Sequence, residues 1–219
     1  ERDDEMSKRI SNAFDQFIKV NFKTDKEISE LSRELKIDIA IDLMCFTTNS
    51  RTGIFSEKCA PIQINYLGYP GTCGPNVMDY IIADNTLITE ENKKFFSEKI
   101  ISLPNCYQPN DDKKIISEKN ITKEDYNLPK DKFIFCNFNR SYKITSKMLK
   151  IWCDILKEKE DSIIWFFADN EITKKNLRNN AVNFGISADR LVFADQTNHS
   201  DHLARHRLAD LFIDTYPYT

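Results

Sequence analysis

Apolar and polar positions follow two alternating patterns along this chain, one typical of strands and the other of helices. Short apolar runs predict strands at 38–43, 62–67, 80–83, 99–103, 133–138, 163–167, 191–193 and 211–213. Helical spacing of apolar residues predicts helices at 4–19, 24–35, 89–97, 145–157, 171–184 and 200–207. Strands that lack internal alternation are expected where helices cover a parallel sheet on both faces. The sequence therefore predicts an α/β fold with parallel sheets and right-handed crossovers.

The stretch 105–131 interrupts this alternation. It is polar, carries prolines at 109 and 129, and includes a run of four charged residues at 111–114. Such a stretch is typical of a connection between two compact parts. We therefore predict an N-terminal lobe at 1–105, a connection at 106–130 and a second lobe at 131–219.

Composition narrows the class of protein. Charged residues make up 30% of the 219 positions and the net charge is -3, so no basic footprint indicates a nucleic-acid partner. The longest apolar run, 163–168, is too short for a membrane span, and the first residues do not resemble a signal peptide. The six cysteines form no Cys-x-x-Cys pair, and we interpret them as reduced thiols. These features predict a soluble, cytoplasmic protein without a membrane partner.

Three of the five glycines, Gly68, Gly71 and Gly74, follow the predicted strand at 62–67. Glycine permits sharp turns and close approach of a ligand to the backbone, and open α/β sheets bind ligands where strands end. The alternative is a purely structural turn. The pattern G-x-x-x-x-G-K-[ST] is absent, which argues against a P-loop nucleotidase.

Lys143 lies just before the predicted helix at 145–157, for which Thr145 is the expected N-cap. A lysine at the positive end of a helix is electrostatically unfavourable, but a lysine beside free helix N–H groups suits a diphosphate. The alternative is a solvated surface lysine.

The three histidines, His199, His202 and His206, are spaced so that they lie near one helix face. This spacing suggests a zinc site. However, the segment lacks the glutamate of H-E-x-x-H, and Arg205 and Arg207 would repel a cation. We therefore predict no metal site here.

Several uncommon segments occur together and in order. They are Ala60–Gln63, Leu67–Thr72, Met78–Tyr80, Cys136–Asn139 and Tyr142–Lys143. In this respect the chain resembles the O-GlcNAc transferase family, in particular its bacterial and SPINDLY-like members, from about Asp3 to Asp214. The resemblance implies a GT-B-like fold, in which two Rossmann-like parallel-sheet lobes face a cleft. The loops at 44–51, 68–76, 139–143 and 195–199, two from each predicted lobe, are compatible with that arrangement.

The resemblance also implies roles for individual residues. Lys143 would be the catalytic residue that contacts the donor diphosphate. His202 and Arg205 match the family's nucleoside-binding residues, whereas His199 replaces its ribose-side lysine. Arg140 stands where members often carry glutamine, and Cys45-Phe46 replaces Gly-Tyr/His. The implied donor-binding residues are Leu67, Gly68, Pro70, Asn139, Tyr142, His199, His202 and Arg205.

The function implied is inverting, metal-independent transfer of GlcNAc from UDP-GlcNAc to Ser or Thr of acceptor proteins, without a cofactor. The family follows TPR repeats, which this chain lacks, and both implied lobes are incomplete. We therefore expect the chain alone to be inactive. Alternatives are the same fold with a fucose or glucose donor, or a catalytically silent nucleotide-sugar-binding or scaffold module.

Overall fold

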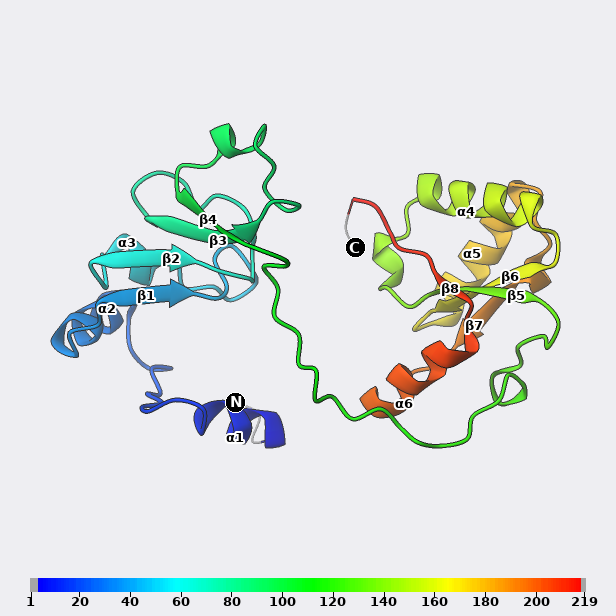
Figure 1. Cartoon of the computed structure of the whole chain (residues 1–219), viewed down its shortest axis with the longest axis horizontal. Coiled ribbons are helices and arrows are strands. Elements are labelled where there is room, and N and C mark those ends of the chain that lie inside the picture. Colours follow the sequence, from blue (N-terminus) through cyan, green and yellow to red (C-terminus); the bar gives the residue numbers. More distant parts are fainter. Residues whose placement is uncertain (1–3, 218–219) are drawn as a thin grey trace. The chain divides into compact units, whose positions relative to one another are not determined.

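The computed structural model describes residues 4–217 and divides into two compact units, Glu1–Asn110 and Asp111–Thr219 (Figure 1). Each unit is built around its own parallel sheet. The predicted α/β class with two parallel-sheet lobes is thereby confirmed. The finer division into lobe, connection and lobe stays a prediction.

The first unit contains a four-stranded sheet in the order β1-β2-β3-β4. Every neighbouring pair is parallel, so all four carboxyl ends lie at one edge. The strands are β1 (Ile39–Asp42), β2 (Ile62–Asn65), β3 (Tyr80–Asp84) and β4 (Lys99–Leu103). The helices of this unit are α1 (Glu5–Ser11), α2 (Asp25–Glu34) and α3 (Gly53–Ser56), with a 3-10 turn at Lys93–Phe95.

The two faces of this sheet differ in burial. One face carries Ala40, Gln63 and Ile81, and Phe55 of α3 packs in the same apolar cluster as Ala40. On the opposite face, the side chains of Ile39 and Ile41 are 51% and 49% exposed. Their strand therefore does not fit the prediction that both faces are covered. The apolar run of β1 reports β-propensity rather than burial, because isoleucine favours strands in either environment.

The second unit contains a four-stranded parallel sheet in the order β7-β6-β5-β8. Its strands are β5 (Phe133–Asn137), β6 (Ser162–Phe167), β7 (Leu191–Ala194) and β8 (Leu211–Phe212). Its helices are α4 (Ser146–Glu158), α5 (Glu171–Asn183) and α6 (His199–Arg205). This order places β5 between β6 and β8, so the loops after β5 and β8 are neighbours.

Both faces of the central strands in this second sheet are covered. On one face, Trp152 of α4 and Leu177 of α5 pack with Phe166. On the other, Trp165 packs with Leu128 and with the ring of Tyr126, which lies 5.1 Å away between centroids. The near-continuous apolar run of β6 is thus explained by burial on both sides.

The predicted strands are all present, with ends shifted by up to two residues. The helix predicted at 4–19 ends at Ser11, and the one predicted at 89–97 is reduced to the turn Lys93–Phe95. The helix predicted at 200–207 is α6 followed by a 3-10 turn at His206–Leu208. The four-residue α3 was not predicted, because a single turn carries no measurable periodicity.

The interpretation of all six cysteines as reduced thiols is wrong for two of them. Cys45 and Cys73 form a disulfide, whereas Cys59, Cys106, Cys136 and Cys153 are free. The disulfide joins the loops after β1 and β2. Its two cysteines are 28 residues apart in sequence, so their spacing did not indicate the pairing.

None of the helices in the described part of the chain has both the length and the apolar composition that a membrane span requires.

Candidate functional site

In the second unit, the loops after β5 and β8 are tied together by two asparagines. The buried Asn137 donates from Nδ2 to the carbonyl of Ile213 at 2.6 Å. Asn139 donates from Nδ2 to Oδ1 of Asp214 at 2.7 Å and to Oγ1 of Thr215 at 3.1 Å. Asn139, one of the predicted donor-binding residues, therefore holds the two loops in a fixed relation at the carboxyl edge of the sheet.

Lys143 ends the 3-10 turn Ser141–Lys143, directly before the thirteen-residue helix α4. Thr145 is the N-cap, as predicted, and its Oγ1 accepts from the N–H of Met148 at 3.2 Å. The Lys143 side chain is partly buried, whereas the neighbouring Tyr142 is 82% exposed. This places a cation beside the positive end of a long helix, an arrangement suited to an anion.

Helix α6 supplies the second group of predicted residues. Asn198 is its N-cap, and Arg205, near its other end, is 2% exposed. The guanidinium carbon of Arg205 lies 4.5 Å from the centre of the Phe138 ring, and one terminal nitrogen donates to the carbonyl of Asp195 at 2.7 Å. The Nε of Arg205 is buried and has no hydrogen-bond partner among residues 4–217. An unpaired buried donor costs free energy unless a ligand satisfies it.

His202 is held against aromatic rings. Its ring makes edge contacts with Phe138 at 5.4 Å and with His206 at 4.9 Å. Burial, together with the charge of Arg205, lowers the pKa of His202 to about 4. The imidazole is therefore neutral near pH 7, with one nitrogen that donates and one that accepts.

These residues surround a cavity of about 200 Å³. Of the predicted donor-binding residues, His202 and Arg205 line it, whereas Lys143, Asn139 and His199 do not. His199 is the exposed first residue of α6. The residues that line the cavity are Phe138, Arg140, Phe167, Gln196, Thr197, His202 and Arg205.

Sequence reasoning did not name Phe138, Phe167, Gln196 or Thr197 as site residues. The available signal was their position at the carboxyl ends of β5, β6 and β7, because ligands bind at that edge of a parallel sheet. A second cavity, of about 380 Å³, lies between the start of α4 and α5 and is lined by Tyr142 among others. In the described part of the chain, no group of three or more His, Cys, Asp or Glu side chains could hold a metal ion.

The predicted donor-binding residues Leu67, Gly68 and Pro70 lie on the glycine-containing loop of the first unit. Leu67 has a positive φ of 73°, and a Cβ on Gly68 would lie 2.7 Å from Cα of Met44 and against the carbonyl of Leu43. Asn65 donates from Nδ2 to the carbonyls of Tyr69 and Gly71 at 3.1 and 2.9 Å. The loop that carries Leu67, Gly68 and Pro70 is therefore packed tightly against the loop after β1.

The cavity at the carboxyl ends of β5, β6 and β7 lies where open α/β sheets bind their ligands. The model of the family described as Glycosyl transferase family 41 matches residues 2–123 and 120–218. The chain belongs to this family, and the resemblance to O-GlcNAc transferases is confirmed.

Individual relatives agree with this assignment. The chain is 33% identical over 216 residues to the probable UDP-N-acetylglucosamine–peptide N-acetylglucosaminyltransferase SEC of Arabidopsis thaliana, covering 96% of this chain and 22% of that protein. It is 30% identical over 203 residues to the similarly named SPINDLY of Petunia hybrida, covering 89% and 21%. The chain thus spans about a fifth of the length of these relatives.

Solved structures show the same fold. A mutant O-GlcNAc transferase of Thermobaculum terrenum superposes with a TM-score of 0.87 at 26% identity, covering 99% of this chain and 41% of that one. A glycosyltransferase of Rickettsia africae gives a TM-score of 0.55 at 14% identity over 96% of this chain and 62% of that one, a likeness of fold alone.

Proposed function

We propose that this chain is the donor-binding part of an inverting, metal-independent glycosyltransferase that transfers GlcNAc from UDP-GlcNAc to Ser or Thr hydroxyls of proteins. The observation that carries the proposal is the pairing, at one sheet edge, of Lys143 beside α4 with the cavity at His202 and Arg205. The names of the relatives supply the donor and the peptide acceptor.

In this reaction the acceptor hydroxyl oxygen attacks the sugar carbon, its proton passes to a base, and the bond from that carbon to the diphosphate oxygen breaks. Negative charge then develops on the leaving UDP. We propose that Lys143 and the first N–H groups of α4 stabilise that charge, because the lysine shortly precedes the helix N-terminus and stabilisation of developing charge is usually the largest catalytic effect. We assign Lys143 this role, with Asn139 and Tyr142 on the same loop.

The cavity at α6 suits the nucleoside part of the donor. Its aromatic residues Phe138 and Phe167 offer apolar surface for a planar base, and the neutral His202 offers a donor and an acceptor. The unpartnered Nε of Arg205 provides a further donor. We assign the base and ribose to this cavity, with His199 on the ribose side.

Calorimetric titration of the full-length protein with UDP, UDP-GlcNAc, UDP-glucose and GDP-fucose tests the proposal. We expect the UDP compounds to bind, with UDP-GlcNAc tightest, and His202→Ala to weaken all of them. Transfer to a Ser/Thr peptide with inversion at the sugar carbon, detected by NMR, would establish the reaction. Binding of none of the nucleotides by a folded protein would refute it.

One observation favours testing a sugar donor other than UDP-GlcNAc. Arg140, which stands where family members often carry glutamine, lines the cavity and adds positive charge to it. If GDP-fucose or UDP-glucose binds at least tenfold more tightly than UDP-GlcNAc, the same fold serves that sugar instead. Tight binding of a nucleotide sugar without turnover would indicate a silent binding module.

A further inference from the structure

The segment 117–119, which belongs to the predicted connection, runs along helix α6 within the same compact unit (Figure 1). The N–H of Ser117 donates to the carbonyl of Ser200 at 3.1 Å. The carbonyl of Ser117 accepts from a terminal nitrogen of Arg207 at 2.9 Å. Two backbone groups of one residue thus bind both the start of α6 and the turn that follows it.

The third contact is an ion pair that reaches the cap of the helix. Lys119 donates from Nζ to Oδ2 of Asp201 at 2.7 Å, and the same oxygen accepts from Nδ2 of Asn198 at 2.8 Å. In return, Oδ1 of Asn198 accepts from the N–H of Asp201 at 2.9 Å. The side chain of Asp201 is 14% exposed, and its hydrogen bonds, led by that of Lys119, lower its pKa to about 2.

Helix α6 needs support of this kind. It has seven residues, and the residues it buries are Ala204 and Arg205, so it lacks a large apolar anchor of its own. Helices of this length are not stable without tertiary contacts. Yet α6 carries His202 and Arg205, and Gln196 and Thr197 directly precede its cap, so its position affects four of the seven residues that line the cavity.

We propose that Ser117 and Lys119 form a strap that positions α6 for nucleotide binding, with Lys119 a positioning residue for the cavity rather than a ligand contact. This inference rests on the proposed function. It assigns to the connection a role in substrate affinity, beyond joining two parts of the chain.

Lys119→Ala in the full-length protein tests the strap, with UDP as the probe. An ion pair with an exposed lysine contributes up to about 1 kcal/mol, so its loss should raise the Kd for UDP, by at most about fivefold. KM for the nucleotide sugar should rise by the same factor while kcat changes less than about twofold, since Lys119 is not placed on the reacting atoms. Lys119→Arg, which keeps the charge, should restore most of the affinity.

Lys130→Ala is the matched control. Lys130 is 69% exposed against 67% for Lys119, and it is paired with Glu124 instead of with α6. Hydrogen exchange should accelerate in residues 196–205 for Lys119→Ala and not for Lys130→Ala.

Three outcomes decide the matter. A larger Kd for Lys119→Ala than for Lys130→Ala, at equal thermal stability, supports the strap. Equal UDP affinity of the two variants overturns it while the proposed function stands. Failure of the folded parent protein to bind UDP refutes the proposed function, and the positioning role with it.

Discussion

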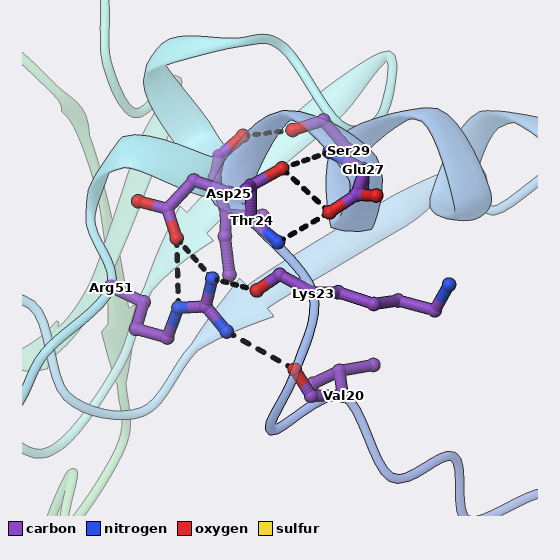
Figure 2. A network of polar contacts seen from close by, with 8 residues as sticks. Val20, Lys23, Thr24, Asp25, Glu27, Ser29 and Arg51 are labelled. Carbon is purple, nitrogen blue, oxygen red and sulfur yellow. Dashed lines mark hydrogen bonds and ion pairs between the residues drawn. The ribbon is translucent and has the colours of Figure 1, made fainter.

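Arg51 and Asp25 are joined across 26 residues of chain, with Nε of Arg51 donating to Oδ1 of Asp25 at 2.7 Å. A terminal nitrogen of Arg51 also donates to the carbonyl of Lys23 at 2.7 Å (Figure 2). The guanidinium therefore fixes the loop after β1 to the start of α2. The same helix start is closed by a capping box, in which Thr24 and Glu27 exchange hydrogen bonds.

Arg51→Ala should lower the free energy of unfolding by about 1 kcal/mol, because it removes charge-assisted hydrogen bonds at a half-exposed position. Arg51→Lys should recover only part of this, since an ammonium cannot reproduce the planar fork. Urea unfolding measures both, with the exposed neighbour Lys26→Ala as control. A variant at position 51 as stable as the control would show that the network contributes nothing.

Lys143→Ala should reduce kcat/KM for sugar transfer about 100-fold, equivalent to roughly 3 kcal/mol of transition-state stabilisation. The reason is that the lysine beside α4 would no longer oppose the charge that develops on the diphosphate. Steady-state kinetics of the full-length enzyme provide the measurement, and the exposed Lys147→Ala on the same helix is the control. Near-normal turnover by Lys143→Ala would exclude the catalytic role.

Transfer activity should survive a strong chelator. In the proposed mechanism Lys143 and helix N–H groups stabilise the leaving group, which is the task of a metal ion in metal-dependent enzymes. Activity assays with and without EDTA, together with metal analysis of the purified protein, give the answer. Loss of activity that zinc or magnesium restores would contradict metal independence.

Acidification should destabilise the fold through His202. Its pKa in the folded state is about 4, against 6.5 for a free histidine, because burial and Arg205 disfavour the charged form. Between these two values the unfolded chain binds the proton and the folded chain does not, so stability is complete above pH 6.5 and is lost as the pH falls toward 4. The contribution of neutral His202 to the free energy of unfolding is on the order of 1–3 kcal/mol.

His202→Gln should therefore flatten the dependence of unfolding free energy on pH in that window. The exposed His199→Gln, which lacks a comparable burial, is the control. Parallel pH profiles for the parent and His202→Gln would show that His202 titrates normally in the folded protein.

Gly68→Ala should destabilise the first unit by about 2–3 kcal/mol, because the new Cβ would overlap the backbone of Leu43 and Met44. Gly74→Ala should cost about 1 kcal/mol, since its Cβ would meet no atom within 4 Å but its φ is +87°. Thermal unfolding of the two variants separates steric overlap from backbone strain. Equal unfolding temperatures of the two variants would show that the loop after β1 can shift to admit the Cβ at little cost in free energy.

All the strands and the longer helices of the second unit follow from the sequence, because they depend on local periodicity and caps, whereas the single turn α3 does not. Thr145 and Gly185 mark the ends of α4 and α5, and the apolar run of β6 shows its burial on both faces. The family could likewise be inferred from linear motifs such as Leu67–Thr72. Lys143 could be singled out because its position relative to a helix end is a local property.

Only the tertiary structure decided how distant segments meet. Strand order brings Asn139 to Asp214, loop packing joins Cys45 to Cys73, and the connection places Lys119 on Asp201. The pKa of His202 likewise depends on the tertiary structure, because burial and the charge of Arg205 lower it. The periodicity of a sequence shows which face of a helix or strand is apolar. Which other element packs against that face depends on the packing of the whole unit.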